Sequence, residues 1–137
     1  MAGSGFSLQL SVADLGTTEA FYAGILRLPV QRAITPIGAP EHLVLRSDGC
    51  EMIFVEDSTL VQVHPILEAR LENFPRGVGI TLHLTVTGIL EINQDLLDQD
   101  LEILYPLVRK PYGIYELWCF DPDGYLIVLE ESIQPTR

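Results

Sequence analysis

The chain has 137 residues, enough for one domain with its own hydrophobic core and too few for two independent domains. With 47% hydrophobic and 20% charged residues, its composition excludes a disordered chain, and no apolar run approaches the roughly 20 residues that cross a bilayer. The net charge of −11 disfavours nucleic-acid binding, because an acidic surface repels phosphate. The same acidity either attracts a cationic partner or only keeps the protein soluble.

The N-terminal stretch MAGSGFSLQLSVADL has neither the basic region nor the unbroken apolar region of a secretory signal. We therefore expect a cytoplasmic protein that does not associate with membranes. Cys50 and Cys119 each lie inside an apolar, strand-like run and are not spaced as metal ligands, so the sequence predicts two buried free thiols.

The first half of the chain predicts a strand, a helix and three further strands. Apolar and polar residues alternate in FSLQLSV (6–12), which is typical of a half-buried strand. A helix is predicted for LGTTEAFYAGIL (15–26), with Asp14 as N-cap and Pro29 beyond its end. Three extended runs follow, LPVQRAI, EHLVLRS and CEMIFVE, separated by the turn-rich segments PIGAP and SDG.

The second half repeats this order. GVGITLHLTV (77–86) predicts a strand, GILEINQDLLDQ (88–99) a helix, and LEILYPLV, GIYELWCF and YLIVLEE three strands, with DPDG as a hairpin turn. The sequence therefore predicts an α+β fold in a single domain, 1–137. Two βαβββ modules, about 5–57 and 77–132, form curved mixed sheets around a cleft and are joined by a connector, 58–76, that holds a short amphipathic helix.

Three stretches, VADLGTTEAFYAGILRLPV, PRGVGITLHLTV and PYGIYELWCFDPDGYLIVLEE, resemble in their order and spacing the vicinal oxygen chelate superfamily. That group includes glyoxalase I, extradiol dioxygenases, and fosfomycin- and bleomycin-resistance proteins. The resemblance covers nearly the whole chain and implies the paired-module fold. One departure is Arg27, where the family often has glycine; this changes a helix end and leaves the fold intact.

In metal-dependent members of this superfamily, a histidine opens the first strand of each half and a glutamate lies in the last strand of each half. Matching the motifs places Ser7 and Thr81 at the histidine positions, and Val128 and approximately Ile53 at the glutamate positions. A divalent transition metal needs three or four nitrogen or oxygen donors at roughly 2.0 to 2.3 Å, which these residues do not supply. We expect no metal and no other cofactor, and assign no catalytic residue.

Strand alternation from the matched positions places hydroxyl, carboxylate, imidazole and indole side chains on the cleft face. An aromatic wall beside carboxylates suits a flat, cationic or amine-bearing molecule, through stacking, cation–π contact and charge-assisted hydrogen bonds. The predicted ligand-binding residues are Gln9, Glu51, His83, Tyr112, Tyr115, Glu116 and Trp118.

These residues also have ordinary structural explanations. Trp118 serves equally well as core packing, and a lone strand histidine such as His83 is more often a hydrogen-bonded structural residue. Glu116 has Arg109 and Lys110 as candidate ion-pair partners. Tyr112 and Tyr115 either close over a ligand as a rim or only form the entrance to a strand.

The resemblance to the bleomycin-resistance branch implies a metal-free homodimer that sequesters a cationic or aromatic small molecule, such as an antibiotic, without altering it. A first alternative is a glyoxalase- or dioxygenase-like lyase or isomerase with a displaced or absent metal and Glu51, Glu116 or His83 as base. A second is a sensor domain for a metabolite or a partner protein. The sequence contains no G-x-S-x-G elbow and no P-loop, which argues against those hydrolase and phosphotransfer classes.

Overall fold

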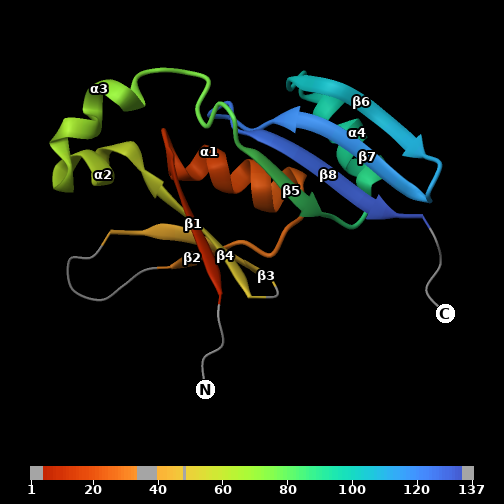
Figure 1. Ribbon diagram of the computed structural model, residues 1–137, viewed down its shortest axis with the longest axis horizontal. Helices are drawn as coiled ribbons and strands as arrows, with labels where there is room; N and C mark the ends of the chain where they lie inside the picture. Colours follow the sequence, from red (N-terminus) through yellow and green to blue (C-terminus); the bar gives the residue numbers. More distant parts are fainter. Residues whose placement is uncertain (1–4, 34–39, 48, 134–137) are drawn as a thin grey trace. The chain divides into compact units, whose positions relative to one another are not determined.

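The structure is a computed structural model that describes residues 5–33, 40–47 and 49–133. The chain forms two compact units, one of Met1–Gly24 and Leu28–Phe74, the other of Ile25–Arg27 and Pro75–Arg137. Each contains a four-stranded mixed sheet with helices (Figure 1), which confirms the predicted α+β class and the two βαβββ modules. None of the described helices is long and apolar enough to cross a membrane.

The first unit is built on sheet order β1-β4-β3-β2, in which β1 runs parallel to β4 and the other pairs are antiparallel. One face is covered by a helix, whose Tyr22 ring packs on Phe54 with 4.7 Å between ring centroids. The connector lies in this unit as three short helical segments. The elements are β1 (Phe6–Val12), α1 (Leu15–Glu19), the π-helical η1 (Ala20–Ile25), β2 (Gln31–Ala33), β3 (His42–Ser47), β4 (Cys50–Glu56), α2 (Asp57–Val63), η2 (Pro65–Leu67) and α3 (Glu68–Leu71).

The second unit repeats the topology, with order β5-β8-β7-β6 and β5 parallel to β8. Its elements are β5 (Thr81–Thr85), α4 (Ile89–Asp98), β6 (Ile103–Lys110), β7 (Ile114–Phe120) and β8 (Leu126–Ser132). Helix α4 buries Ile89, Ile92 and Leu96, whose spacing places them on one side of the helix. The residues of the sheet that share the side of α4 include Leu117 and Leu129, both fully buried.

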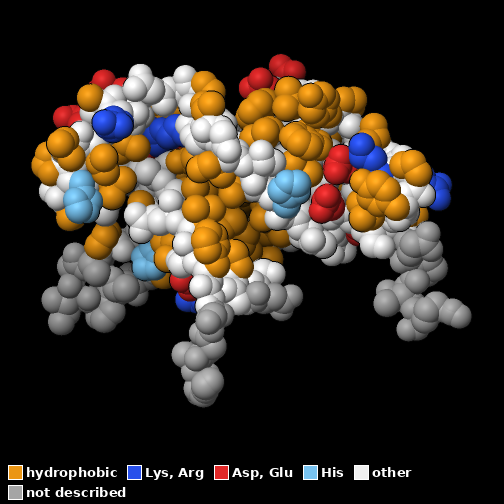
Figure 2. Space-filling view, viewed as in Figure 1, with side chains coloured by type: hydrophobic (Ala, Val, Ile, Leu, Met, Phe, Trp, Pro, Cys, Tyr) orange, Lys and Arg blue, Asp and Glu red, His pale blue; other side chains and the backbone are white. Residues whose placement is uncertain are grey.

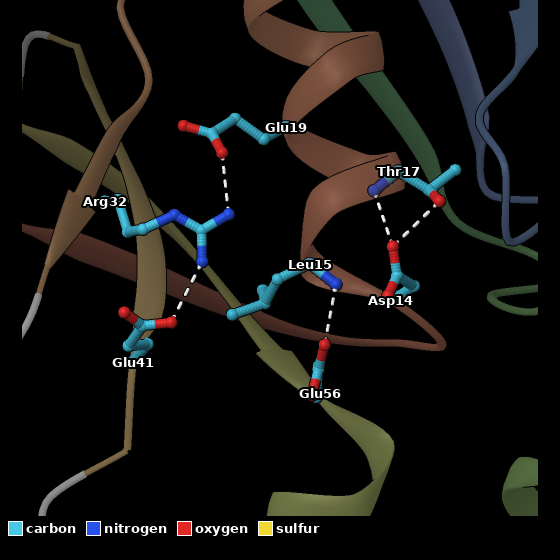
Figure 3. A network of polar contacts seen from close by, with 7 residues as sticks. All are labelled: Asp14, Leu15, Thr17, Glu19, Arg32, Glu41 and Glu56. Carbon is cyan, nitrogen blue, oxygen red and sulfur yellow. Dashed lines mark hydrogen bonds and ion pairs between the residues drawn. The ribbon is translucent and has the colours of Figure 1, made fainter.

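The helix starts show that the repeat extends to individual contacts. Asp14 caps α1 by accepting hydrogen bonds from the backbone N–H and the hydroxyl of Thr17, each 2.8 Å, and these bonds hold the pKa of Asp14 below its usual value (Figure 3). The N–H of Leu15 donates to Glu56 at the end of β4, 3.0 Å away (Figure 3).

Glu131 near the end of β8 makes the equivalent contact in the second unit. It accepts from the N–H of Gly88 at 3.0 and 3.1 Å and from the N–H of Ile89 at 2.8 Å. Gly88 is the N-cap of α4 and has no side chain with which to cap it. The carboxylate from β8 therefore satisfies the free N–H groups at the helix start and places α4 on the Glu131 side of the sheet.

The predicted DPDG turn between β7 and β8 is confirmed. The Asp121 carboxylate accepts from the N–H groups of Asp123 and Tyr125, 2.9 Å each. Gly124 has φ +91°, and a Cβ there would lie 2.6 Å from the Cβ of Pro75. The turn thus packs closely on the PRG segment that precedes β5.

Two details differ from, or add to, the sequence analysis. Cys119 is buried as predicted, and burial, with the nearby charge of Asp121, raises the pKa of its thiol to about 12. Cys50 is exposed, so the prediction of two buried thiols is wrong for this residue, which opens β4 next to the turn at Gly49. Arg27 has φ +60°, the left-handed conformation that glycine adopts without strain.

Candidate functional site

The candidate site lies on the face of the second sheet opposite α4, here called the site face. Glu131, Leu129 and Ile127 point toward α4, so strand alternation places Val128 and Leu126 on the site face. Register adds the neighbours of Val128, which are His83 on β5 and Trp118 on β7. The residues that share this face are Thr81, His83, Thr85, Glu116, Trp118, Phe120, Leu126, Val128 and Glu130.

A hollow of about 360 Å³ opens on the site face over β6 and β7. Apolar groups dominate it: the indole of Trp118 and the ring of Tyr105 meet edge to face, with 5.4 Å between centroids and 78° between planes. The residues that line it are Tyr105, Pro106, Val108, Lys110, Glu116 and Trp118. Tyr105 and Val108 are among the exposed side chains of β6, where hydrophobic atoms gather on the surface (Figure 2).

One polar cluster stands at the wall of this hollow. The indole N–H of Trp118 donates to Oε1 of Glu116 at 3.1 Å, and Nζ of Lys110 lies 3.4 Å from the same oxygen. The Glu116 side chain is 14% exposed and that of Lys110 36%. Of the two ion-pair partners considered for Glu116, the structure selects Lys110. Arg109 pairs in register with Tyr115, on the α4 side of the sheet.

The other predicted residues of the second unit lie in three different environments. His83 is exposed on the site face, and its imidazole makes no hydrogen bond to another described residue. Tyr112 is 66% exposed in the turn between β6 and β7. Tyr115 pairs with Glu131 and lies on the α4 side, so it does not share a face with Glu116 and Trp118.

Gln9 and Glu51 belong to the first unit, where both lie on the face of the sheet opposite α1. Ser7 pairs with Glu51 and Gln9 with Ile53 in the parallel β1–β4 ladder. The Glu51 carboxylate accepts a hydrogen bond from Nε of Arg46 on β3 at 2.9 Å. Gln9 is exposed. Within its unit, Glu51 is therefore one member of a cross-strand ion pair.

Of the three residues that complete these clusters, sequence reasoning missed Arg46 and Tyr105 and named Lys110. Arg46 could have been found, because SDG is a turn-type sequence and a regular hairpin around it pairs Ser47 with Cys50 and Arg46 with Glu51. Lys110 was considered only as one of two ion-pair partners for Glu116. Tyr105 could not be assigned from the sequence pattern, since a register shift between Tyr105 and Val108 in β6 brings it opposite Trp118.

The positions that the resemblance assigns to metal ligands do not suit a metal. Ser7 and Thr81 offer hydroxyl groups, and Ile53 and Val128 offer only hydrocarbon; Val128 is 0% exposed. In the described residues, no group of three or more His, Cys, Asp or Glu side chains could hold a metal ion. We therefore derive no chemistry through a metal.

Comparison with protein-family models and with curated proteins gives no match for this chain. Solved structures do match over nearly its whole length. A hypothetical protein from S. aureus has a TM-score of 0.64 at 14% identity, covering 96% of this chain and 94% of its own. A member of the glyoxalase/bleomycin resistance protein/dioxygenase superfamily from Sphaerobacter thermophilus has a TM-score of 0.62 at 18% identity, covering 96% and 98%.

A glyoxalase/bleomycin resistance protein/dioxygenase from Alicyclobacillus acidocaldarius has a TM-score of 0.55 at 14% identity, covering 96% of this chain and 92% of that one. At these identities the likeness concerns the fold. The chain therefore has the fold of glyoxalase/bleomycin resistance/dioxygenase proteins.

Proposed function

We propose that this protein is a metal-free binding protein of the bleomycin-resistance type, which sequesters a flat aromatic or cationic small molecule without altering it. The observation that carries the proposal is the hollow lined by Tyr105 and Trp118 with Glu116 at its wall. A volume of about 360 Å³ lies in the range of small-molecule sites, which are mostly apolar with few polar groups.

The aromatic pair supplies the binding surface. A ring that lies on the Trp118 indole or against Tyr105 gains contact area and favourable quadrupole contacts, and a cationic ring gains cation–π attraction as well. Glu116 is a charge-assisted acceptor for an N–H at the edge of such a ring. The net charge of −11 favours the approach of cationic ligands over anionic ones.

Thermal-shift measurements on metal-stripped protein test this function. The panel contains cationic and aromatic antibiotics, bleomycins among them, and divalent metals; ligands that bind only the folded protein raise its melting temperature. A shift with a drug and none with metals supports sequestration. A strong shift with zinc, nickel, iron or manganese alone contradicts it and favours the glyoxalase-like enzyme.

Variants then locate the binding. Trp118→Leu removes the ring from the hollow and should abolish the drug-induced shift. Leu97→Ala is the matched control, because Leu97 is an exposed apolar residue of α4 that lies neither in the hollow nor on β6. Equal drug shifts in both variants would place the ligand elsewhere.

The proposal includes a homodimer as the functional form. Strand β6 lies at the edge of its sheet and exposes Leu104, Tyr105 and Val108, a surface that a second copy would cover. Sedimentation velocity at several protein concentrations distinguishes the dimer from a monomer.

A further inference from the structure

The hollow contains an internal cation. Lys110 at the end of β6 lies diagonally across the strand pair from Glu116, with Nζ 3.4 Å from Oε1. Both residues line the hollow, and Lys110 is the only basic residue among those that do. The ammonium group therefore occupies the place where the amine of a cationic ligand would pair with the carboxylate.

We propose that Lys110 determines the charge selectivity of the site: it neutralises Glu116, so that the wild-type hollow selects flat, uncharged aromatic molecules over cationic ones of the same shape. This inference rests on the proposed function. The inference also narrows the proposed function, because a cationic ligand must then displace Lys110 from Glu116 before it can pair with the carboxylate.

The other groups around the carboxylate support this role. Glu130 on β8 pairs in register with Glu116 on the same face, so two carboxylates share this part of the sheet. The Trp118 indole N–H and Lys110 both contact Oε1, and no described residue donates a hydrogen bond to Oε2. Lys110 offsets one of these two negative charges; without it both carboxylates would be uncompensated, and Oε2 of Glu116 would be free to accept from a ligand.

The ion pair is accessible enough to be replaced. The Lys110 side chain is 36% exposed, so its ammonium is partly solvated, and Glu116, at 14% exposure, keeps the hydrogen bond from the Trp118 indole N–H when Lys110 is replaced. Substitution should therefore change binding more than it changes stability.

The single tryptophan of the chain, Trp118, makes the test direct, because its fluorescence reports only on this site. The probes are quinoline, uncharged at neutral pH, and N-methylquinolinium, which has the same ring system and a permanent positive charge. Each is titrated against the wild type, Lys110→Met, Lys110→Gln and Lys110→Arg. Arg109→Met is the matched control, since it removes one positive charge from the adjacent residue on the α4 side of the sheet.

We expect Lys110→Met and Lys110→Gln to bind N-methylquinolinium about tenfold more tightly than the wild type, a change of about 1.4 kcal/mol, with quinoline affinity changed less than about twofold. Lys110→Arg and Arg109→Met should behave as the wild type. Circular dichroism checks that each variant is folded.

The possible outcomes distinguish failure of the Lys110 selectivity role from failure of the proposed binding function. If both probes quench Trp118 and the Lys110 variants leave their ratio of affinities unchanged, the function stands and the selectivity role is wrong. If Arg109→Met gives the same increase as Lys110→Met, the effect is long-range electrostatics and the role is also wrong. If neither probe binds to any variant, the proposed function fails together with the inference.

Discussion

Replacement of Glu131 by alanine should destabilise the second unit more than replacement of Glu56 destabilises the first. Glu131 accepts three N–H contacts of 2.8 to 3.1 Å from Gly88 and Ile89, at a helix whose N-cap has no side chain. Glu56 accepts one contact of 3.0 Å, from Leu15, at a helix that Asp14 also caps.

The expected magnitudes follow from these contacts. Loss of a helix cap costs about 0.5 to 2 kcal/mol, and hydrogen bonds to a charged acceptor lie at the upper end. We therefore expect Glu131→Ala to lower the free energy of unfolding by about 2 kcal/mol and Glu56→Ala by about 1 kcal/mol. Glu131→Gln, which keeps an acceptor oxygen and loses the charge, should lie between Glu131→Ala and the wild type.

Urea denaturation followed by far-ultraviolet circular dichroism measures these differences. A loss of 2 kcal/mol corresponds to a midpoint shift of about 1 M for a typical urea dependence. Glu130→Ala is the control, because it removes a carboxylate from the adjacent residue of β8, whose side chain lies on the other face. It should leave stability unchanged or slightly raised, since Glu130 faces the like charge of Glu116. Surface substitutions typically change the free energy of unfolding by no more than about 0.5 kcal/mol. If the free energies of unfolding of Glu131→Ala and Glu130→Ala differ by less than about 0.5 kcal/mol, the capping argument is wrong.

Three further predictions concern the backbone and the thiols. Arg27→Gly should be about 1 kcal/mol more stable than Arg27→Ala in urea denaturation, because both lose the exposed ion pair to Asp95 and only glycine relieves the φ of +60°; equal stabilities would contradict the strain. Gly124→Ala should cost about 2 kcal/mol more than Gly79→Ala, since both have positive φ but only Gly124 has atoms within 3 Å of an added Cβ. Native protein should react with Ellman's reagent at Cys50 alone, because the pKa of about 12 keeps Cys119 protonated, and denatured protein at both; two fast thiols in the native state would show that Cys119 is accessible.

Alternation and turn chemistry made most of the fold predictable from the sequence. The period of two in FSLQLSV and ITLHLTV, and the helical spacing of Ile89, Ile92 and Leu96, are local signals that tertiary contacts then reinforce. The same parity correctly placed Glu116 and Trp118 on one face, because β7 is regular along its whole length. Tyr115, the residue next to Glu116, was grouped with them as part of a rim, although alternation directs its side chain to the α4 side.

The partners of these residues were harder to predict, since they depend on register. Counting back from the turn that pairs Lys110 with Ile114 would place Pro106 opposite Trp118 in a regular hairpin. Proline has no N–H to donate to the ladder, and the strand shifts register on both sides of Tyr105. The Tyr105–Trp118 pair that lines the hollow therefore depends on a register shift in β6, which the pattern of hydrophobic residues does not predict.

Valine at position 128 determines what kind of chemistry the site face can support. A carboxylate at a position that is 0% exposed would need a cation or several donors beside it to offset the loss of hydration. In register, Val128 lies between His83 and Trp118, so its hydrocarbon side chain separates an imidazole from an indole. Negative charge within the hollow comes instead from Glu116, which the Trp118 indole N–H and Lys110 already contact. Under the proposed function, a ligand of this face would be recognised by the shape of its ring and by the groups on its edge, and Lys110 would select for its charge.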